Sequence, residues 1–184
     1  QRLERMAPNY VQTYLGFAEL YLIAGENEKA VAAAEKAYAL PDKRETRGAL
    51  FIPVFSVYLL ADSFDEAREF MNEYLTETGN AFPPIGPQSE IELVIQRSRR
   101  GGAVEGRLRL FEEIEKKFVE AYGYPQPALL LEMIDIYRAQ GNETRIRELL
   151  TLYATPEMKE RARKSIDEGR NPGSKADWER FLKR

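Results

Sequence analysis

Residues 14–40 read YLGFAELYLIAGENEKAVAAAEKAYAL, and the fold follows from this stretch. Its first half repeats large apolar side chains at intervals of three and four residues, the spacing that lines one face of an α-helix. Gly25 can take the left-handed backbone angle that ends such a helix. Small alanines recur in the second half, so a second helix can lie close to the first. The stretch predicts a helical hairpin built on Tyr14, Phe17, Ala18, Tyr21, Ala30, Ala34 and Ala37.

Polar side chains at the expected helix starts predict capping hydrogen bonds. Asn27 and Asn142 each follow shortly after a glycine that ends a helical pattern. Ser63 has an acid three residues later and so matches a capping box, and Thr155 precedes a proline that suits the first helical position. We expect each of these four side chains to accept a bond from a backbone amide.

The same pattern returns along the chain, most clearly near its far end. There Leu130, Met133, Ile134 and Tyr137 repeat the apolar stripe, and Gly141 repeats Gly25. Such a helix–turn–helix unit resembles the tetratricopeptide repeat, whose period is 34 residues. Unit starts here step by roughly 37 to 40 residues. The resemblance implies an all-α fold, a right-handed α–α superhelix or solenoid of about four to five helical hairpins.

We expect a single helical-repeat domain over residues 1–184. Its predicted units span about 9–43, 46–80, 88–123 and 125–154, and capping helices close it over 155–184. Gln1–Pro8 resembles the end of an earlier repeat, so this chain is expected to be a fragment of a longer one. The proline-rich stretch Ala81–Gln88 reads AFPPIGPQ and cannot be regular helix, which leaves a linker, a polyproline-type ligand or a packed lid.

Composition argues against several classes of function. The chain has no histidine and no cysteine, so the usual general base, the thiolate nucleophile and the commonest metal ligand are missing. Acidic pairs such as Glu112 and Glu113 have ordinary helix-surface spacing. No apolar run approaches the roughly 20 residues of a membrane span, and a formal net charge of −3 argues against a nucleic-acid partner. We expect a non-enzyme that needs no metal or cofactor.

Arginines gather around the glycine pair at positions 101 and 102. They are Arg97, Arg99, Arg100, Arg107 and Arg109. Arginines near a glycine-rich turn can hold a phosphate, a carboxylate or a sulfate, and the same side chains can simply complement a helix C-terminus. The sequence therefore leaves an anion or partner patch and a structural role both open.

In tetratricopeptide repeats the first helices of successive units line a concave groove. Carried over residue by residue, the resemblance implies a partner-binding groove that is largely apolar. An apolar groove suits an amphipathic helix, a peptide or a neighbouring domain, although the chain's own loop or helix could also fill it. The implied groove residues are Gln12, Leu15, Glu19, Leu22, Ile23, Ile52, Ser56, Leu59, Leu60, Leu131, Asp135 and Arg138.

Two functions follow as hypotheses. The first is a non-catalytic scaffold that binds a protein or peptide partner, or another domain of its own chain, in that groove. The alternative is the soluble repeat domain of a larger cell-envelope protein. It rests on residues 7–31, APNYVQTYLGFAELYLIAGENEKAV, which resemble the repeats that follow multispanning glycan polymerases and ligases. No cellular compartment follows from the sequence.

Overall fold

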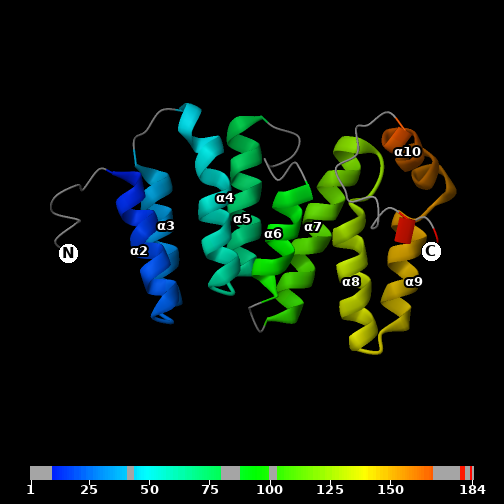
Figure 1. Ribbon diagram of the computed structural model, residues 1–184, viewed down its shortest axis with the longest axis horizontal. Helices are drawn as coiled ribbons and strands as arrows, with labels where there is room; N and C mark the ends of the chain where they lie inside the picture. The colour runs from blue at the N-terminus through cyan, green and yellow to red at the C-terminus, as the bar shows by residue number, and fades with distance from the viewer. Residues whose placement is uncertain are drawn as a thin grey trace. The chain divides into compact units, whose positions relative to one another are not determined.

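The computed structural model describes residues 10–40, 44–79, 88–99, 103–167, 179–180 and 183. Within these residues the chain forms nine α-helices and no β-strand, which confirms the all-α class (Figure 1). The predictions for Gln1–Pro8, for residues 81–87 and for Arg100 lie outside the described residues. The helices are α2 (Val11–Ile23), α3 (Asn27–Ala39), α4 (Arg44–Leu60), α5 (Phe64–Thr78), α6 (Gln88–Ser98), α7 (Val104–Tyr122), α8 (Pro127–Ala139), α9 (Glu143–Tyr153) and α10 (Pro156–Asp167).

The chain divides into two compact units. Unit 1 comprises Gln1–Gly79 with Gln96–Arg107, and unit 2 comprises Asn80–Ile95 with Leu108–Arg184. In unit 1, α2 packs on α3 and α4 packs on α5, while α4 also contacts both helices of the first pair. In unit 2, α8 packs on α9 (Figure 1). Antiparallel pairs joined by short turns are thus the building block of both units.

Three of the connecting turns share one backbone conformation. Gly25 joins α2 to α3 with φ +73°, Asp62 joins α4 to α5 with φ +63°, and Gly141 joins α8 to α9 with φ +68°. The left-handed angle predicted for Gly25 is therefore confirmed, and the same angle recurs at an aspartate that the sequence does not mark. These positions are where the chain reverses direction between two packed helices.

The hydrogen bonds of these turns repeat as well. In each turn the amide two residues beyond the helix cap donates to the carbonyl of a tyrosine five residues earlier, which is the Schellman arrangement. This bond satisfies a carbonyl that the helix end would otherwise leave without a partner. The pairs are Glu26 with Tyr21 at 2.8 Å, Ser63 with Tyr58 at 2.9 Å, and Asn142 with Tyr137 at 2.9 Å.

Aromatic side chains hold unit 1 together. Phe51 of α4 is fully buried, with its ring centroid 5.3 Å from that of Phe70 and 4.7 Å from that of Tyr74, both on α5. Phe70 also meets Tyr38 of α3, at 4.8 Å and nearly edge-on. Such ring pairs add to the burial of their area, so α3, α4 and α5 share one core.

The helix α4 is longer than a simple repeat predicts. It begins at Arg44 and carries Pro53 in its interior, so the proline lies within a long helix rather than in the first turn of a short one. The Pro53 ring lies on the exposed side of the helix.

In unit 2 the core is built from three helices, α7, α8 and α9. Its buried residues include Phe111, Ile114, Phe118, Leu129, Leu130, Met133, Ile134, Ile146 and Leu149.

Two of the four predicted side-chain caps are confirmed. Asn142 Oδ1 accepts from the Arg145 amide at 3.2 Å, and Thr155 Oγ1 accepts from the Met158 amide at 3.2 Å. Ser63 stands at the helix start but makes no capping bond with its side chain. The prediction for Asn27 is wrong, because its Nδ2 instead donates to the carbonyl of Ala61 at 3.0 Å. That carbonyl lies at the end of α4 and has no partner within its own helix.

Candidate interaction surfaces

The predicted groove residues fall into three classes of exposure. Gln12, Glu19 and Ile23 on α2 are exposed, as are Asp135 and Arg138 on α8. Four more are half-buried, namely Leu15, Leu22, Ile52 and Leu60. The remaining three are buried, with Leu59 at 0%, Leu131 at 3% and Ser56 at 4% exposure, so their side chains present no surface to a partner.

The exposed groove residues of α8 are engaged in ion pairs. Arg138 Nη1 lies 2.6 Å from Asp135 Oδ1, and Arg180 Nη2 lies 3.7 Å from Asp135 Oδ2. Arg180 belongs to the C-terminal part of the same chain, so part of the predicted α8 surface is contacted by the chain itself. The α8 residues lie in unit 2, whereas the other groove residues lie in unit 1.

On α2 two large apolar side chains are exposed. Only Tyr14 and Ala18 of this helix are buried. Ile23 is 84% exposed and Leu20 is 59% exposed, and both sit in a helix whose other residues are mostly apolar. Single exposed apolar side chains are ordinary, but adjoining ones on one helix mark a contact surface. α2 is therefore the strongest candidate surface in unit 1.

In contrast to the exposed side chains of α2, one apolar face of α4 is buried. Val54, Val57, Tyr58 and Ala61 lie at i, i+3, i+4 and i+7, and each is at most 5% exposed. The Tyr58 hydroxyl donates to Glu35 Oε1 of α3 at 3.2 Å. Burial raises the pKa of Tyr58 well above its ordinary value, and the nearby Glu35 carboxylate raises it further. The hydroxyl therefore stays protonated and acts as a donor.

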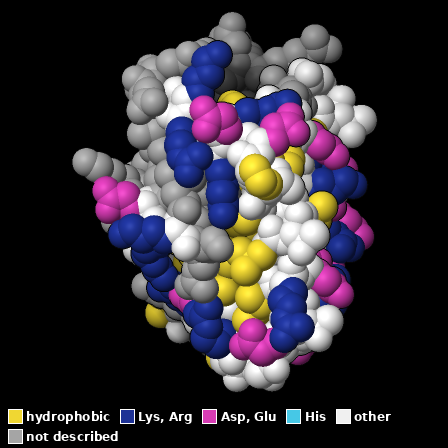
Figure 2. All heavy atoms as spheres, turned by 90° about the vertical axis from the view of Figure 1, so that its right-hand side faces the viewer, with side chains coloured by type: hydrophobic (Ala, Val, Ile, Leu, Met, Phe, Trp, Pro, Cys, Tyr) yellow, Lys and Arg dark blue, Asp and Glu magenta, His cyan; other side chains and the backbone are white. Residues whose placement is uncertain are grey.

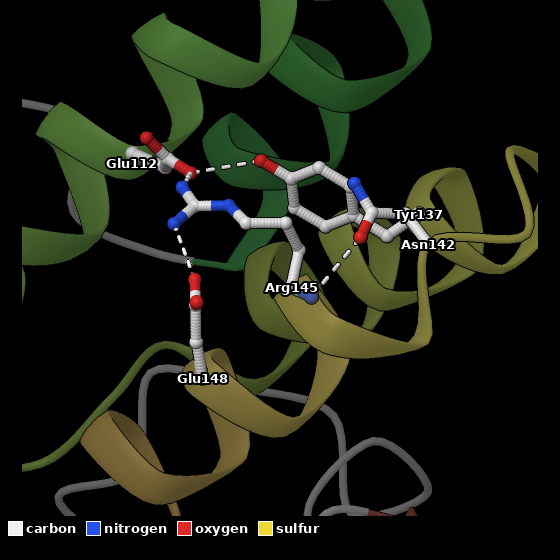
Figure 3. A network of polar contacts seen from close by, with 5 residues as sticks. All are labelled: Glu112, Tyr137, Asn142, Arg145 and Glu148. Atoms are coloured by element: carbon white, nitrogen blue, oxygen red, sulfur yellow. Dashed lines mark hydrogen bonds and ion pairs between the residues drawn. The ribbon is translucent and has the colours of Figure 1, made fainter.

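In unit 2 the corresponding tyrosine belongs to a larger network, drawn in Figure 3. The Tyr137 hydroxyl of α8 donates to Glu112 Oε1 of α7 at 2.9 Å, and Arg145 Nη2 of α9 donates to the same oxygen at 2.6 Å. Arg145 Nη1 also donates to Glu148 Oε2 at 2.7 Å. Burial raises the pKa of Tyr137, so this hydroxyl too remains a donor. The network ties α7, α8 and α9 together.

A buried carboxyl group supports the turn before α8. Glu115 of α7 has no exposed surface, and its Oε1 accepts from the Gln126 amide at 2.9 Å. Gln126 Oε1 in turn accepts from the Leu129 amide at 2.9 Å and caps α8. Burial raises the pKa of Glu115 well above its ordinary value, although the bond from Gln126 lowers it in part. Glu115 interrupts the apolar stripe of Phe111, Ile114 and Phe118, and this acidic residue on an apolar helix face is the signal that the sequence carries for it.

The predicted arginine patch is divided between the units. Arg97, Arg99 and Arg107 belong to unit 1 and Arg109 to unit 2. Arg107 Nη1 donates to the carbonyl of Ser98, the last residue of α6, at 3.3 Å. This contact favours the structural interpretation for Arg107, because it satisfies a carbonyl at a helix C-terminus. Arg97 lies in the last turn of α6, where a positive charge also complements the helix dipole.

The outer side of α9 carries an open hollow of about 440 Å³. In Figure 2, which looks onto α9 and α10, hydrophobic side chains run along the middle of the face, with charged side chains around them. Among the residues that the structure describes, those that line the hollow all come from α9. They are Thr144, Arg147, Glu148, Thr151 and Leu152.

Two further observations concern the described residues as a whole. They contain no group of three or more acidic, histidine or cysteine side chains placed to hold a metal ion. None of their helices combines the length and apolar character that crossing a bilayer requires. Comparisons of the chain with protein-family models, with curated proteins and with solved structures find no match.

Proposed function

We propose that this protein is a helical-repeat scaffold that binds a helical segment of a partner protein. The exposed apolar surface of α2 carries the proposal, above all the 84% exposure of Ile23. When a partner buries this isoleucine, the complex is stabilised by about 25 cal/mol for each Å² of apolar surface removed from water. Helix-in-groove recognition uses apolar anchors of this kind.

The repeated turns support a tetratricopeptide-like arrangement. Ile23 and Leu15 stand two and ten residues before Gly25, and Leu60 and Ile52 stand two and ten residues before Asp62. Side chains at equivalent positions of α2 and α4, which contact each other, can form one continuous groove wall in unit 1. In this proposal the hairpins stack into a right-handed superhelix of about four to five units, and Gln12 and Glu19 form the polar edge of the groove.

The test is capture of a partner by the immobilised protein. Ile23→Asp places a charge in the proposed contact surface without disturbing the core, so the captured partner is expected to be lost while helicity by circular dichroism is unchanged. Leu152→Asp is the matched control, because this leucine is 58% exposed on α9 in the other unit. If Ile23→Asp captures the partner as well as the unaltered protein does, α2 is not the binding surface and the proposal fails.

A further inference from the structure

The turn between α7 and α8, residues 123–126, is buried although it is an irregular segment. Gln126 has no exposed surface and Tyr124 is 7% exposed. Gly123 has a left-handed φ of +75°, and a Cβ added there would lie 2.6 Å from Arg161 Nη1 of α10. The turn therefore lies against a side chain of α10. The backbone polar groups of such a buried turn need partners within the protein.

Glu115 of α7 supplies one of these partners. Its Oε1 accepts from the Gln126 amide at 2.9 Å. Gln126 in turn begins α8, because its side chain accepts from the Leu129 amide at 2.9 Å and its carbonyl accepts from the Leu130 amide at 3.1 Å. The bond from Glu115 therefore holds in place the residue that caps α8.

The second carboxyl oxygen of Glu115 has no hydrogen-bond partner among the described residues. Glu115 is 0% exposed, so solvent does not reach this oxygen while the turn is closed. A neutral carboxyl group tolerates such a place much better than a carboxylate, because an unpaired charge costs far more to bury than an unpaired polar group. Burial accordingly raises the pKa of Glu115 well above its ordinary value, although the bond from Gln126 lowers it in part.

The groups around Glu115 do not compensate a negative charge there. Within the described residues Glu115 forms no ion pair. Burial raises the pKa of Tyr153 to about 12, with a smaller contribution from Glu115, so this phenol is neutral. Arg161, the cation of α10 that lies against the turn, pairs with Glu157 at 2.6 Å. The buried ionisable groups on the neighbouring elements are Tyr124 of the turn, Glu132 and Tyr137 of α8, and Tyr153 of α9.

We propose that the contact between Glu115 and Gln126 is a pH-sensitive switch, which keeps the α7–α8 turn closed while the carboxyl group is neutral and lets the turn open when the proton is lost. Ionisation in the closed turn leaves a charged oxygen without a donor, whereas opening lets water solvate it. Opening also releases the Gln126 cap of α8 and exposes Tyr124. The switch is independent of the proposed function, whose surface on α2 and α4 lies in unit 1.

The direction of the switch follows from the two states of the carboxyl group. In the open turn Glu115 has its ordinary pKa of 4.5, and in the closed turn its pKa is raised. Above pH 4.5 the open turn therefore releases the proton more readily, and each further pH unit increases the ratio of open to closed turns by about tenfold. The increase ends where the carboxyl group ionises in the closed turn as well.

Hydrogen exchange of the full chain, resolved by residue with NMR between pH 5 and pH 7, tests the switch. The amides of Gln126 and Leu129 exchange only when their bonds within the turn open. Their protection factors, which correct for the intrinsic effect of pH on exchange, are expected to fall by about tenfold for each pH unit. Glu115→Gln is expected to remove this fall, whereas the matched control Glu120→Gln, on the exposed side of α7, is expected to retain it.

Low concentrations of urea separate opening of the turn from unfolding of the whole chain. Opening of one turn exposes little surface, so exchange at Gln126 and Leu129 is expected to depend only weakly on urea. The amide of Ile114, a fully buried residue in the middle of α7, is the reference, because its exchange requires a larger opening. It is expected to be better protected and to lose protection more steeply with urea.

Three results overturn the proposal. One is protection at Gln126 and Leu129 that does not change with pH, and another is the same pH dependence in Glu115→Gln. The third is exchange at these amides that matches Ile114 in rate and in urea dependence, which would show that the turn opens only with the whole chain. If Glu115→Gln does not fold, the ¹³C shift of the Glu115 carboxyl group in the unaltered protein decides. A titration midpoint near pH 4.5 overturns the switch, and a raised midpoint supports it.

Discussion

The hydroxyl of Tyr137 and the guanidinium of Arg145 share one oxygen of Glu112, at 2.9 and 2.6 Å (Figure 3). The guanidinium carbon of Arg145 also lies 5.6 Å from the centre of the Tyr137 ring. One carboxylate on α7 therefore holds a residue of α8 and a residue of α9, and the loss of this carboxylate disturbs both.

Replacing this carboxylate tests how much the network contributes to the free energy of unfolding. Glu112→Gln keeps the shape of the side chain but removes the charge that both donors share, so the free energy of unfolding is expected to fall by about 1 kcal/mol. Urea denaturation measures the change. Glu160→Gln is the control, because Glu160 pairs with Arg163 at 3.4 Å on the exposed surface of α10 and should cost less than about 0.5 kcal/mol. Equal effects at both positions would show that sharing the carboxylate adds nothing.

Asp62 serves two structural purposes at one position. It holds the left-handed angle of the α4–α5 turn, and its carboxylate accepts from the amide of Ala103, directly before α7, at 3.1 and 3.3 Å. Asp62→Ala loses the capping bond and strains the backbone, at a cost of about 2 kcal/mol. Asp62→Gly loses only the bond, at about 1 kcal/mol, and Asp62→Asn can keep both features and should cost least.

Thermal or urea unfolding of the three Asp62 variants gives the order directly. Destabilisation is expected to increase from asparagine to glycine to alanine. If glycine is as damaging as alanine, the backbone angle contributes nothing, and if all three match the unaltered protein, the bond to Ala103 has no energetic role.

The helices and two of the left-handed turns could be predicted from local pattern alone. Apolar spacing and a glycine suffice where the turn uses Gly25 or Gly141. The left-handed turn at Asp62 could not be predicted, because aspartate is only one of several residues that tolerate this backbone angle. What selects it is the Ala103 amide, which is 41 residues away along the chain.

The wrong prediction of a cap at Asn27 and the burial of two predicted groove residues have a similar origin. Asn27 was expected to cap its own helix, but the carbonyl of Ala61, 34 residues on, competes for its side chain. Leu59 and Leu131 match groove positions of the repeat pattern, yet neighbouring helices bury them. A pattern within one helix predicts which residues share a face, whereas the element that covers that face depends on contacts distant in sequence.

Two helix glycines offer opposite outcomes for the same substitution. A Cβ added at Gly16 of α2 meets no atom within 4 Å, so Gly16→Ala should raise the free energy of unfolding by about 0.5–1 kcal/mol. A Cβ added at Gly106 of α7 lies 3.2 Å from Cβ and Cδ2 of Phe64, a buried residue. Gly106→Ala should therefore lower stability despite the better helix propensity of alanine. Thermal melts of both variants decide the matter, and a stabilising Gly106→Ala would mean that Phe64 moves without cost.

The buried Glu115 predicts how stability depends on pH. Its pKa in the folded protein is raised above the ordinary value of 4.5, so above pH 4.5 the unfolded chain releases this proton more readily than the folded protein does. The unfolded state then binds fewer protons, and the free energy of unfolding falls as pH increases. The contribution of Glu115 is thus most favourable below pH 4.5 and is progressively lost above it. Glu115→Gln cannot ionise, so it should remove this part of the pH dependence.

Urea denaturation at pH 5 and pH 8 tests this expectation. The Glu115→Gln variant should gain stability relative to the unaltered protein between pH 5 and pH 8, because only the latter must keep a carboxyl group neutral or bury a charge. Its amide oxygen can still accept from Gln126, so the turn before α8 should persist. Glu120→Gln, at an exposed position of the same helix, is the control and should show no such gain. An equal difference between variant and unaltered protein at both pH values would show that Glu115 titrates alike in the folded and unfolded states.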